Sequence, residues 1–113
     1  MMKNKLNILW INDNPDTAHT MVFMYAINAK TQNWFDEVEI IIWGPTAKLV
    51  AEDESIQEKI KIAKHSGVII KACISCANMF GVTDKLKSLD IEVYGMGIPL
   101  TNILKGNEKL LTI

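Results

Sequence analysis

Apolar and polar residues follow one another along this 113-residue chain in short blocks whose period changes from block to block. Short apolar runs, rich in β-branched residues and often followed by Gly, Asn or Pro, predict buried strands. These runs lie at residues 6–11, 38–43, 68–72, 91–94 and 109–113. Between them, apolar residues recur at a spacing of three and four, which predicts helices. Strands that alternate with helices indicate βαβ units and a mostly parallel sheet with helices on both faces.

The first predicted helix follows the turn Asn12-Asp13-Asn14-Pro15 and extends to about Asn33. Asp16 or Thr17 is the expected cap, since short polar side chains accept hydrogen bonds from the first free N–H groups. Helical spacing predicts one main buried face, made of Ala18, Met21, Val22, Tyr25 and Ala29. Phe23 lies off that face.

The second clear helix has recognisable start and stop signals. Ser55-Ile56-Gln57-Glu58 matches a capping box and predicts that the helix begins at Ser55. Gly67 stands where a helix end favours a residue with positive φ, and Gly81 has the same place after a shorter helix at 73–80.

Composition narrows the class of protein. The length fits one domain, residues 1–113, and 49% of the residues are apolar, enough for a real core. A net charge of −1 argues against a dedicated nucleic-acid binder or a protein of anionic membrane surfaces. No apolar run reaches the roughly 20 residues that span a bilayer, and no signal-peptide cleavage site follows the first run, so we expect a cytoplasmic protein.

Candidate chemistry centres on Cys73, at the junction of the third strand and the next helix. In open α/β sheets, ligands gather beyond the carboxyl ends of the strands. A thiol there also lies near the free N–H groups of a helix, which favour the thiolate and lower a thiol pKa from about 8.5 towards neutrality. The thiolate is the nucleophile, so the position alone can make this cysteine reactive.

The other strand ends supply possible companions for the thiol. Asn12 and Asp13 follow the first strand, and Gly44 follows the second. Gly95 and Gly97 follow the fourth strand, where glycine allows close approach of the backbone to a ligand. Asp13 would act against a thiolate, because a nearby carboxylate raises a thiol pKa. The sequence leaves open which of these residues face the cysteine.

Two interpretations of each cysteine stay open. A cysteine at a strand end often fills a core as a small hydrophobic residue, so Cys73 can be inert. Cys76 can resolve a persulfide or mixed disulfide on Cys73 by thiol–disulfide exchange, or be a small residue that faces the sheet, which we favour slightly. No metal site is expected, because His19 and His65 lack the spacing of a zinc finger. No cofactor is expected either, since Gly95-Met96-Gly97 lacks the third glycine of a dinucleotide fingerprint.

The segment Lys71 to Val82 resembles the DsrE/DsrF family, in which a strand delivers a cysteine and a Gly-Val-like pair closes the next helix about eight residues later, or two helical turns. Here Cys73 and Gly81-Val82 keep that spacing. The resemblance implies a three-layer α/β/α fold with a mostly parallel five-stranded sheet, DsrE-like and flavodoxin-like in outline. It also implies homo-oligomers, commonly trimers or hexamers.

The resemblance implies a function as well. Better-known members of the family relay sulfur as a cysteine persulfide between donor and acceptor proteins, and the cysteine carried over is Cys73. The leading hypothesis is therefore an intracellular sulfur-relay protein, a possible sulfurtransferase, with Cys73 and Cys76 as the catalytic residues. The alternatives are a non-catalytic module of the same fold that binds a small ligand or a protein, and a dithiol redox protein.

Overall fold

The computed structural model describes residues 4–113 and has the predicted alternation of strands and helices. The elements in chain order are β1 (Lys5–Trp10), α1 (Pro15–Thr17), the π-helical segment η1 (Ala18–Phe23), α2 (Met24–Thr31), β2 (Glu37–Ile42), α3 (Thr46–Glu52), α4 (Glu54–His65), β3 (Ile69–Cys73), α5 (Ile74–Met79), α6 (Thr83–Ser88), β4 (Glu92–Tyr94), α7 (Gly97–Lys105) and β5 (Lys109–Thr112). None of the helices formed by these residues is long and apolar enough to cross a membrane.

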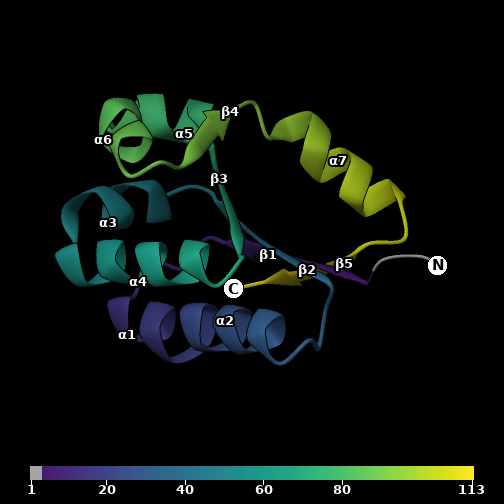
Figure 1. Ribbon diagram of the computed structural model, residues 1–113. Coiled ribbons are helices and arrows are strands. Elements are labelled where there is room, and N and C mark those ends of the chain that lie inside the picture. Colours follow the sequence, from purple (N-terminus) through teal and green to yellow (C-terminus); the bar gives the residue numbers. More distant parts are fainter. Residues whose placement is uncertain (1–3) are drawn as a thin grey trace.

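All five strands are parallel and form one sheet in the order β4-β3-β2-β1-β5. Segment η1 and helices α2 to α6 pack their apolar residues into one large cluster on one face of this sheet. Helix α7 covers the other face and stands apart from the other helices (Figure 1). The predicted α/β/α fold with a parallel five-stranded sheet is therefore confirmed.

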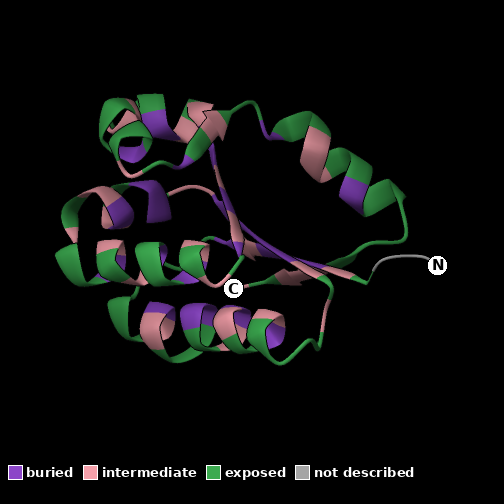
Figure 2. Ribbon diagram, viewed as in Figure 1, coloured by how far each residue is buried: buried purple, intermediate pink, exposed green. Residues whose placement is uncertain are grey.

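The larger core lies between the sheet and helices α1 to α6. Alternate residues of β1, namely Leu6, Ile8 and Trp10, point into it, as the two-residue period of a strand requires. Trp10 packs edge to face on Phe23, with the ring centroids 5.4 Å apart. The buried residues of the helices line the side that faces the sheet (Figure 2).

The first helix departs from the predicted buried face because its middle is π-helical. Phe23 is fully buried, whereas Met21 is exposed, so the prediction for Met21 was wrong. A π-helical turn holds one residue more than an α-helical turn, and the residues after it are rotated about the axis relative to a regular α-helix. Ala26 is consequently buried in place of Tyr25, which is half-buried.

Two helix caps also lie earlier than predicted, by two or three residues. Asn14, rather than Asp16 or Thr17, caps α1, because its side chain accepts from both of their backbone N–H groups. At α4 the cap is Asp53, which accepts from the backbone N–H of Ser55 at 2.9 Å, so Ser55 lies inside the first turn. In both places the cap lies at least two residues before the residue that the sequence pattern favoured.

The expected helix ends are confirmed. Gly67 has φ +98° and Gly81 has φ +67°, both in the region that favours glycine. Gly81 closes α5 and fixes the length of the segment that follows Cys73.

Candidate functional site

Cys73 is the last residue of β3 and the N-cap of α5, the junction that the sequence predicted. Its thiol lies on the α7 side of the sheet, where it packs with Ile41 of β2, Met96 and Ile103 of α7. Only 5% of the residue is exposed. The sulfur is therefore enclosed by apolar side chains and does not lie open at the edge of the sheet.

Cys76 stands three residues further on, in the first turn of α5. Its Sγ accepts a hydrogen bond from the backbone N–H of Gly44 at 3.2 Å, and the residue is half-buried. Burial raises the pKa of the Cys76 thiol; the Gly44 N–H acts in the opposite direction, and Cys73 adds to the rise. Cys76 is thus a protonated thiol near neutral pH, with a fixed polar partner and a neighbouring thiol.

Gly44 lies just after the end of β2 and contacts Cys76 through its N–H. The loop that follows Gly44 fixes its conformation. Its φ of +68° lies in the left-handed region that glycine adopts without strain. Two residues after it, the fully buried Thr46 donates its hydroxyl to the carbonyl of Trp10 at 2.8 Å and accepts from the N–H of Trp43 at 3.2 Å. The Gly44 N–H is therefore aimed at Cys76 by a loop that is bonded to two strand ends.

The loop after β4 approaches Cys73 through a side chain and not through its glycines. Met96 is almost fully buried and packs against Cys73. Gly95 and Gly97 on either side of it are exposed, and a Cβ placed on either would meet no atom within 4 Å. Both glycines are therefore open to solvent, and their approach to a ligand stays a prediction.

Asn12 and Asp13 follow β1, but the hydrogen bonds of Asn12 lead elsewhere. Its side-chain carbonyl accepts from the N–H of Asn14 at 2.9 Å, and its own N–H donates to the carbonyl of Ile113 at 3.1 Å. Asp13 is exposed. Of the predicted companions, the structure therefore brings Gly44 to the cysteines, and it uses Asn12 to shape the turn after β1.

A row of charged side chains lies on the same face of the sheet as Cys73. Glu39 is only 2% exposed and lies between Lys71, 3.1 Å away, and Lys5, 3.4 Å away. Burial works against the charge of Lys71, but its contacts with Tyr94 and Glu39 outweigh this and raise the Lys71 pKa above its ordinary value. Lys71 precedes Cys73 by two residues, so a fixed positive charge lies on the same side of β3 as the thiol.

The row continues to β5 through Asn7. Asn7 is fully buried, and its Nδ2 donates to Glu108 at 3.2 Å and to the carbonyl of Lys109 at 3.3 Å. Its Oδ1 is buried without a hydrogen-bond partner. This row was not predicted, although polar residues at every second position of the first two strands (Lys5 and Asn7, Glu37 and Glu39) were a signal for it.

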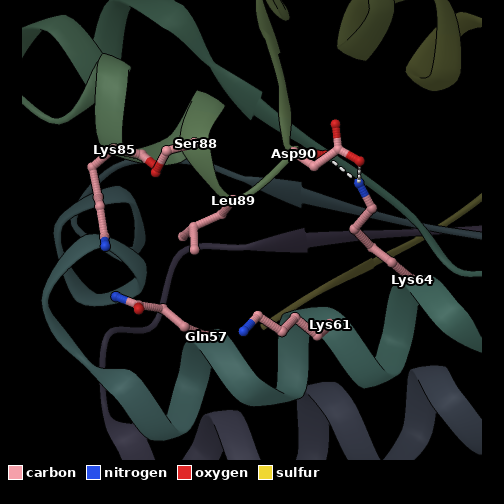
Figure 3. A pocket seen from close by; sticks show the side chains of 7 residues that line it. All are labelled: Gln57, Lys61, Lys64, Lys85, Ser88, Leu89 and Asp90. Carbon is pink, nitrogen blue, oxygen red and sulfur yellow. Dashed lines mark hydrogen bonds and ion pairs between the residues drawn. The ribbon is translucent and has the colours of Figure 1, made fainter.

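A hollow of about 540 Å³ lies on the opposite face, between α4 and α6 (Figure 3). It is lined by Gln57, Lys61, Lys64, Lys85, Ser88, Leu89 and Asp90. Lys64 and Asp90 form an ion pair across one side of it, at 3.2 Å. This hollow is separate from the two cysteines, since neither of them lines it. Within residues 4–113, no group of three His, Cys, Asp or Glu side chains is placed to hold a metal ion.

A comparison with known protein families gives a match over most of the chain. The DsrE/DsrF-like family matches residues 7–112, nearly the whole chain. The chain belongs to this family. Membership of the DsrE/DsrF-like family fits a role related to sulfur relay.

Two solved structures of this fold are similar to the chain. A conserved protein of unknown function from Bacteroides thetaiotaomicron, BT1422, is 46% identical, with a TM-score of 0.95, and the match covers 97% of this chain and 95% of that one. The ychN protein from E. coli is 16% identical, with a TM-score of 0.72 and coverage of 99% and 100%, a likeness of fold alone. No curated protein matches the chain.

Proposed function

We propose that this DsrE/DsrF-like protein is a sulfur carrier that holds sulfur as a persulfide on Cys73. The observation that carries the proposal is the place of this residue: the last position of β3, with a second thiol and the Gly44 N–H beside it, in a chain of this family. The apolar side chains of Ile41, Met96 and Ile103 support it further, since they keep water from a sulfur that is easily lost.

In the proposed reaction the Cys73 thiolate attacks the outer sulfur of a donor persulfide. The sulfur–sulfur bond of the donor breaks, a new one forms to Cys73 Sγ, and the donor leaves as a thiolate. Transfer to an acceptor thiolate repeats this step in the other direction. Because Met96 covers the sulfur, each transfer needs the 95–97 loop to move aside, and its two exposed glycines allow such a movement.

Intact-mass spectrometry after incubation with glutathione persulfide tests the proposal. We expect Cys76→Ser to gain the mass of one sulfur atom and Cys73→Ser to gain none. The serine at position 76 keeps an acceptor for the Gly44 N–H, so this variant preserves the loop. If Cys76→Ser gains no sulfur, or Cys73→Ser gains as much, the proposal is wrong.

The low exposure of Cys73 favours a second candidate, a non-catalytic module of the same fold that binds a small ligand or a protein. At 5% exposure a thiol is typical of a residue that fills a core. This candidate predicts slow alkylation of Cys73 by iodoacetamide at pH 7 in the Cys76→Ser variant. Alkylation as fast as that of free cysteine would exclude it.

We further propose that the protein forms a homo-oligomer, a trimer or hexamer, and meets separate donor and acceptor proteins. Helix α7 supports this, because it leaves Ile98 77% exposed and Leu104 65% exposed on its outer side. Exposed apolar residues on one element are typical of a contact surface. Sedimentation equilibrium should give a mass three or six times that of one chain, and a monomer at high concentration would contradict it.

A further inference from the structure

We propose that Cys76 discharges the persulfide of Cys73, by forming a Cys73–Cys76 disulfide and releasing the outer sulfur as hydrosulfide. This inference rests on the proposed function and assigns the second cysteine a part in it. It makes the two thiols a site at which bound sulfur is either passed on or reduced.

The spacing of the two residues suits a disulfide. Cys73 is the N-cap of α5, which makes Cys76 the third residue of the helix. Helix geometry places residues three apart at about 5 Å between Cα atoms. Disulfides join Cα atoms that are about 4.4 to 6.8 Å apart, so the pair lies within this range without movement of the backbone.

The direction of the side chains agrees with the spacing. Cys73 makes no side-chain cap hydrogen bond in α5, so its thiol is not engaged by the N–H groups of the helix. The two thiols lie close enough together for Cys73 to raise the Cys76 pKa, and Cys76 packs against the apolar cluster to which Cys73 belongs. The Gly44 N–H, 3.2 Å from Cys76 Sγ, holds this sulfur in place from the β2 side.

The chemical step balances without a further reagent. Cys76 loses its proton to solvent, and its thiolate attacks Sγ of Cys73. The sulfur–sulfur bond of the persulfide breaks, and the outer sulfur leaves as hydrosulfide with the electron pair. The outer sulfur is reduced, Cys76 Sγ is oxidised, and Cys73 Sγ keeps the oxidation state that it had in the persulfide; one hydrosulfide appears for each disulfide.

The environment of Cys76 sets when the step occurs. Since burial raises the pKa of this thiol, little thiolate is present near pH 7, and bound sulfur persists long enough to reach an acceptor. More alkaline conditions increase the thiolate and hasten discharge. The same Gly44 N–H that positions the sulfur also opposes part of this rise in the pKa.

The test follows sulfide release after loading. The wild type, Cys76→Ser and Cys76→Ala are each loaded with glutathione persulfide and desalted, and released sulfide is then measured at pH 7 and pH 9 by a sulfide electrode. We expect the wild type to release at least tenfold more sulfide at pH 9 than either variant. Its intact mass should then be that of the reduced, unloaded chain minus two hydrogen atoms. Both variants should keep the added sulfur. Thermal unfolding checks that they are folded.

A positional control uses the neighbouring residue. In the double variant Ser75→Cys, Cys76→Ser, the second thiol moves to an exposed position on another side of the helix, so the chain should retain its sulfur. A wild type incubated without the persulfide should form little disulfide over the same time. Equal disulfide without the donor, or equal discharge by the positional control, would overturn the inference.

The outcomes separate this inference from the function on which it rests. If Cys76→Ser takes up sulfur and the wild type also keeps its sulfur without releasing sulfide, the discharge by Cys76 is wrong and the carrier remains. If Cys76→Ser and Cys76→Ala take up no sulfur and the wild type releases none, both proposals are wrong.

Discussion

Replacement of Gly44 by alanine tests whether the backbone beside Cys76 has to be glycine. The added Cβ would meet only Cγ2 of Ile11, at 3.7 Å, which is an ordinary van der Waals contact. Any loss of stability must therefore come from the backbone, whose φ is +68°. Gly95→Ala is the matched control, because Gly95 also follows a strand but has neither a positive φ nor an atom within 4 Å of its Cβ position.

The expected magnitude follows from these two conformations. A non-glycine residue in the left-handed region costs about 1–2 kcal/mol. Alanine at a compatible glycine position stabilises by about 0.4–1 kcal/mol, because it restricts the unfolded chain. For 113 residues the unfolding entropy is about 0.24 kcal/mol per kelvin, so 1 kcal/mol corresponds to a shift in Tm of about 4 °C. Gly44→Ala should lower Tm by about 4–8 °C, and Gly95→Ala should raise it by about 2–4 °C.

Differential scanning calorimetry of the three proteins at pH 7, in the presence of a reductant, measures these shifts. Alkylation of Cys76 should also become slower in Gly44→Ala, since a displaced Gly44 N–H no longer favours the thiolate. Equal Tm values for the two alanine variants would refute the argument from backbone conformation. A lower Tm for Gly95→Ala would show that the loop after β4 is more constrained than its open surroundings indicate.

Three further predictions concern charge, protonation and capping. Glu39→Gln should lower the free energy of unfolding by about 1–3 kcal/mol, because half-buried Lys71 loses its counter-charge and Lys5 keeps only Glu108, although both lysines still reach solvent. Glu58→Gln should lower the free energy of unfolding by less than about 0.5 kcal/mol, because Glu58 belongs to an exposed ion pair. Urea unfolding measures the loss in both variants, and equal losses would contradict burial as the cause of the difference. In a variant that lacks Cys73, the rate of Cys76 alkylation should reach half its maximum at a higher pH than for free cysteine, because burial raises the pKa of the Cys76 thiol. A midpoint at a lower pH than that of free cysteine would contradict the buried environment. Since the unfolded thiol ionises first, Cys76 should contribute stability that is lost as the pH rises from the ordinary thiol pKa to the folded one. Asp53→Ala should lower the free energy of unfolding by about 1 kcal/mol, because the Asp53 carboxylate accepts hydrogen bonds from two backbone N–H groups. Ser55→Ala should lower it less. If urea unfolding gives the reverse order, Ser55 is the cap.

Local features of the sequence were enough to predict where Cys73 lies. A β-branched run, a cysteine and a helical segment ended by Gly81 determine a strand–helix junction within about a dozen residues. The same local reasoning predicted the parallel sheet, since alternating strands and helices leave few other arrangements. The near neighbours of the cysteine along the chain therefore decide its position in the fold.

The surroundings of the thiol could not be predicted in this way, because they come from distant parts of the chain. Met96 and Ile103 cover Cys73 only because α7 packs on that face of the sheet. The hydrogen bond from Gly44 to Cys76 likewise joins the ends of two different strands. The misplacement of Met21 has another cause: a π-helical turn changes the helical period, and the spacing of apolar residues assumes a constant one.

Strand β5 has a consequence for the synthesis of the protein. It pairs with β1, so that Leu6 lies opposite Lys109, and the N–H of Ile11 donates to the carbonyl of Ile113 at 2.7 Å. A ribosome that adds about 5–20 residues per second makes β1 some 5–20 seconds before the strand that covers its open edge. An uncovered edge strand is a template for pairing with other chains. Nascent chains that stall before β5 should therefore associate with one another, and β1 is the segment that a chaperone would need to shield.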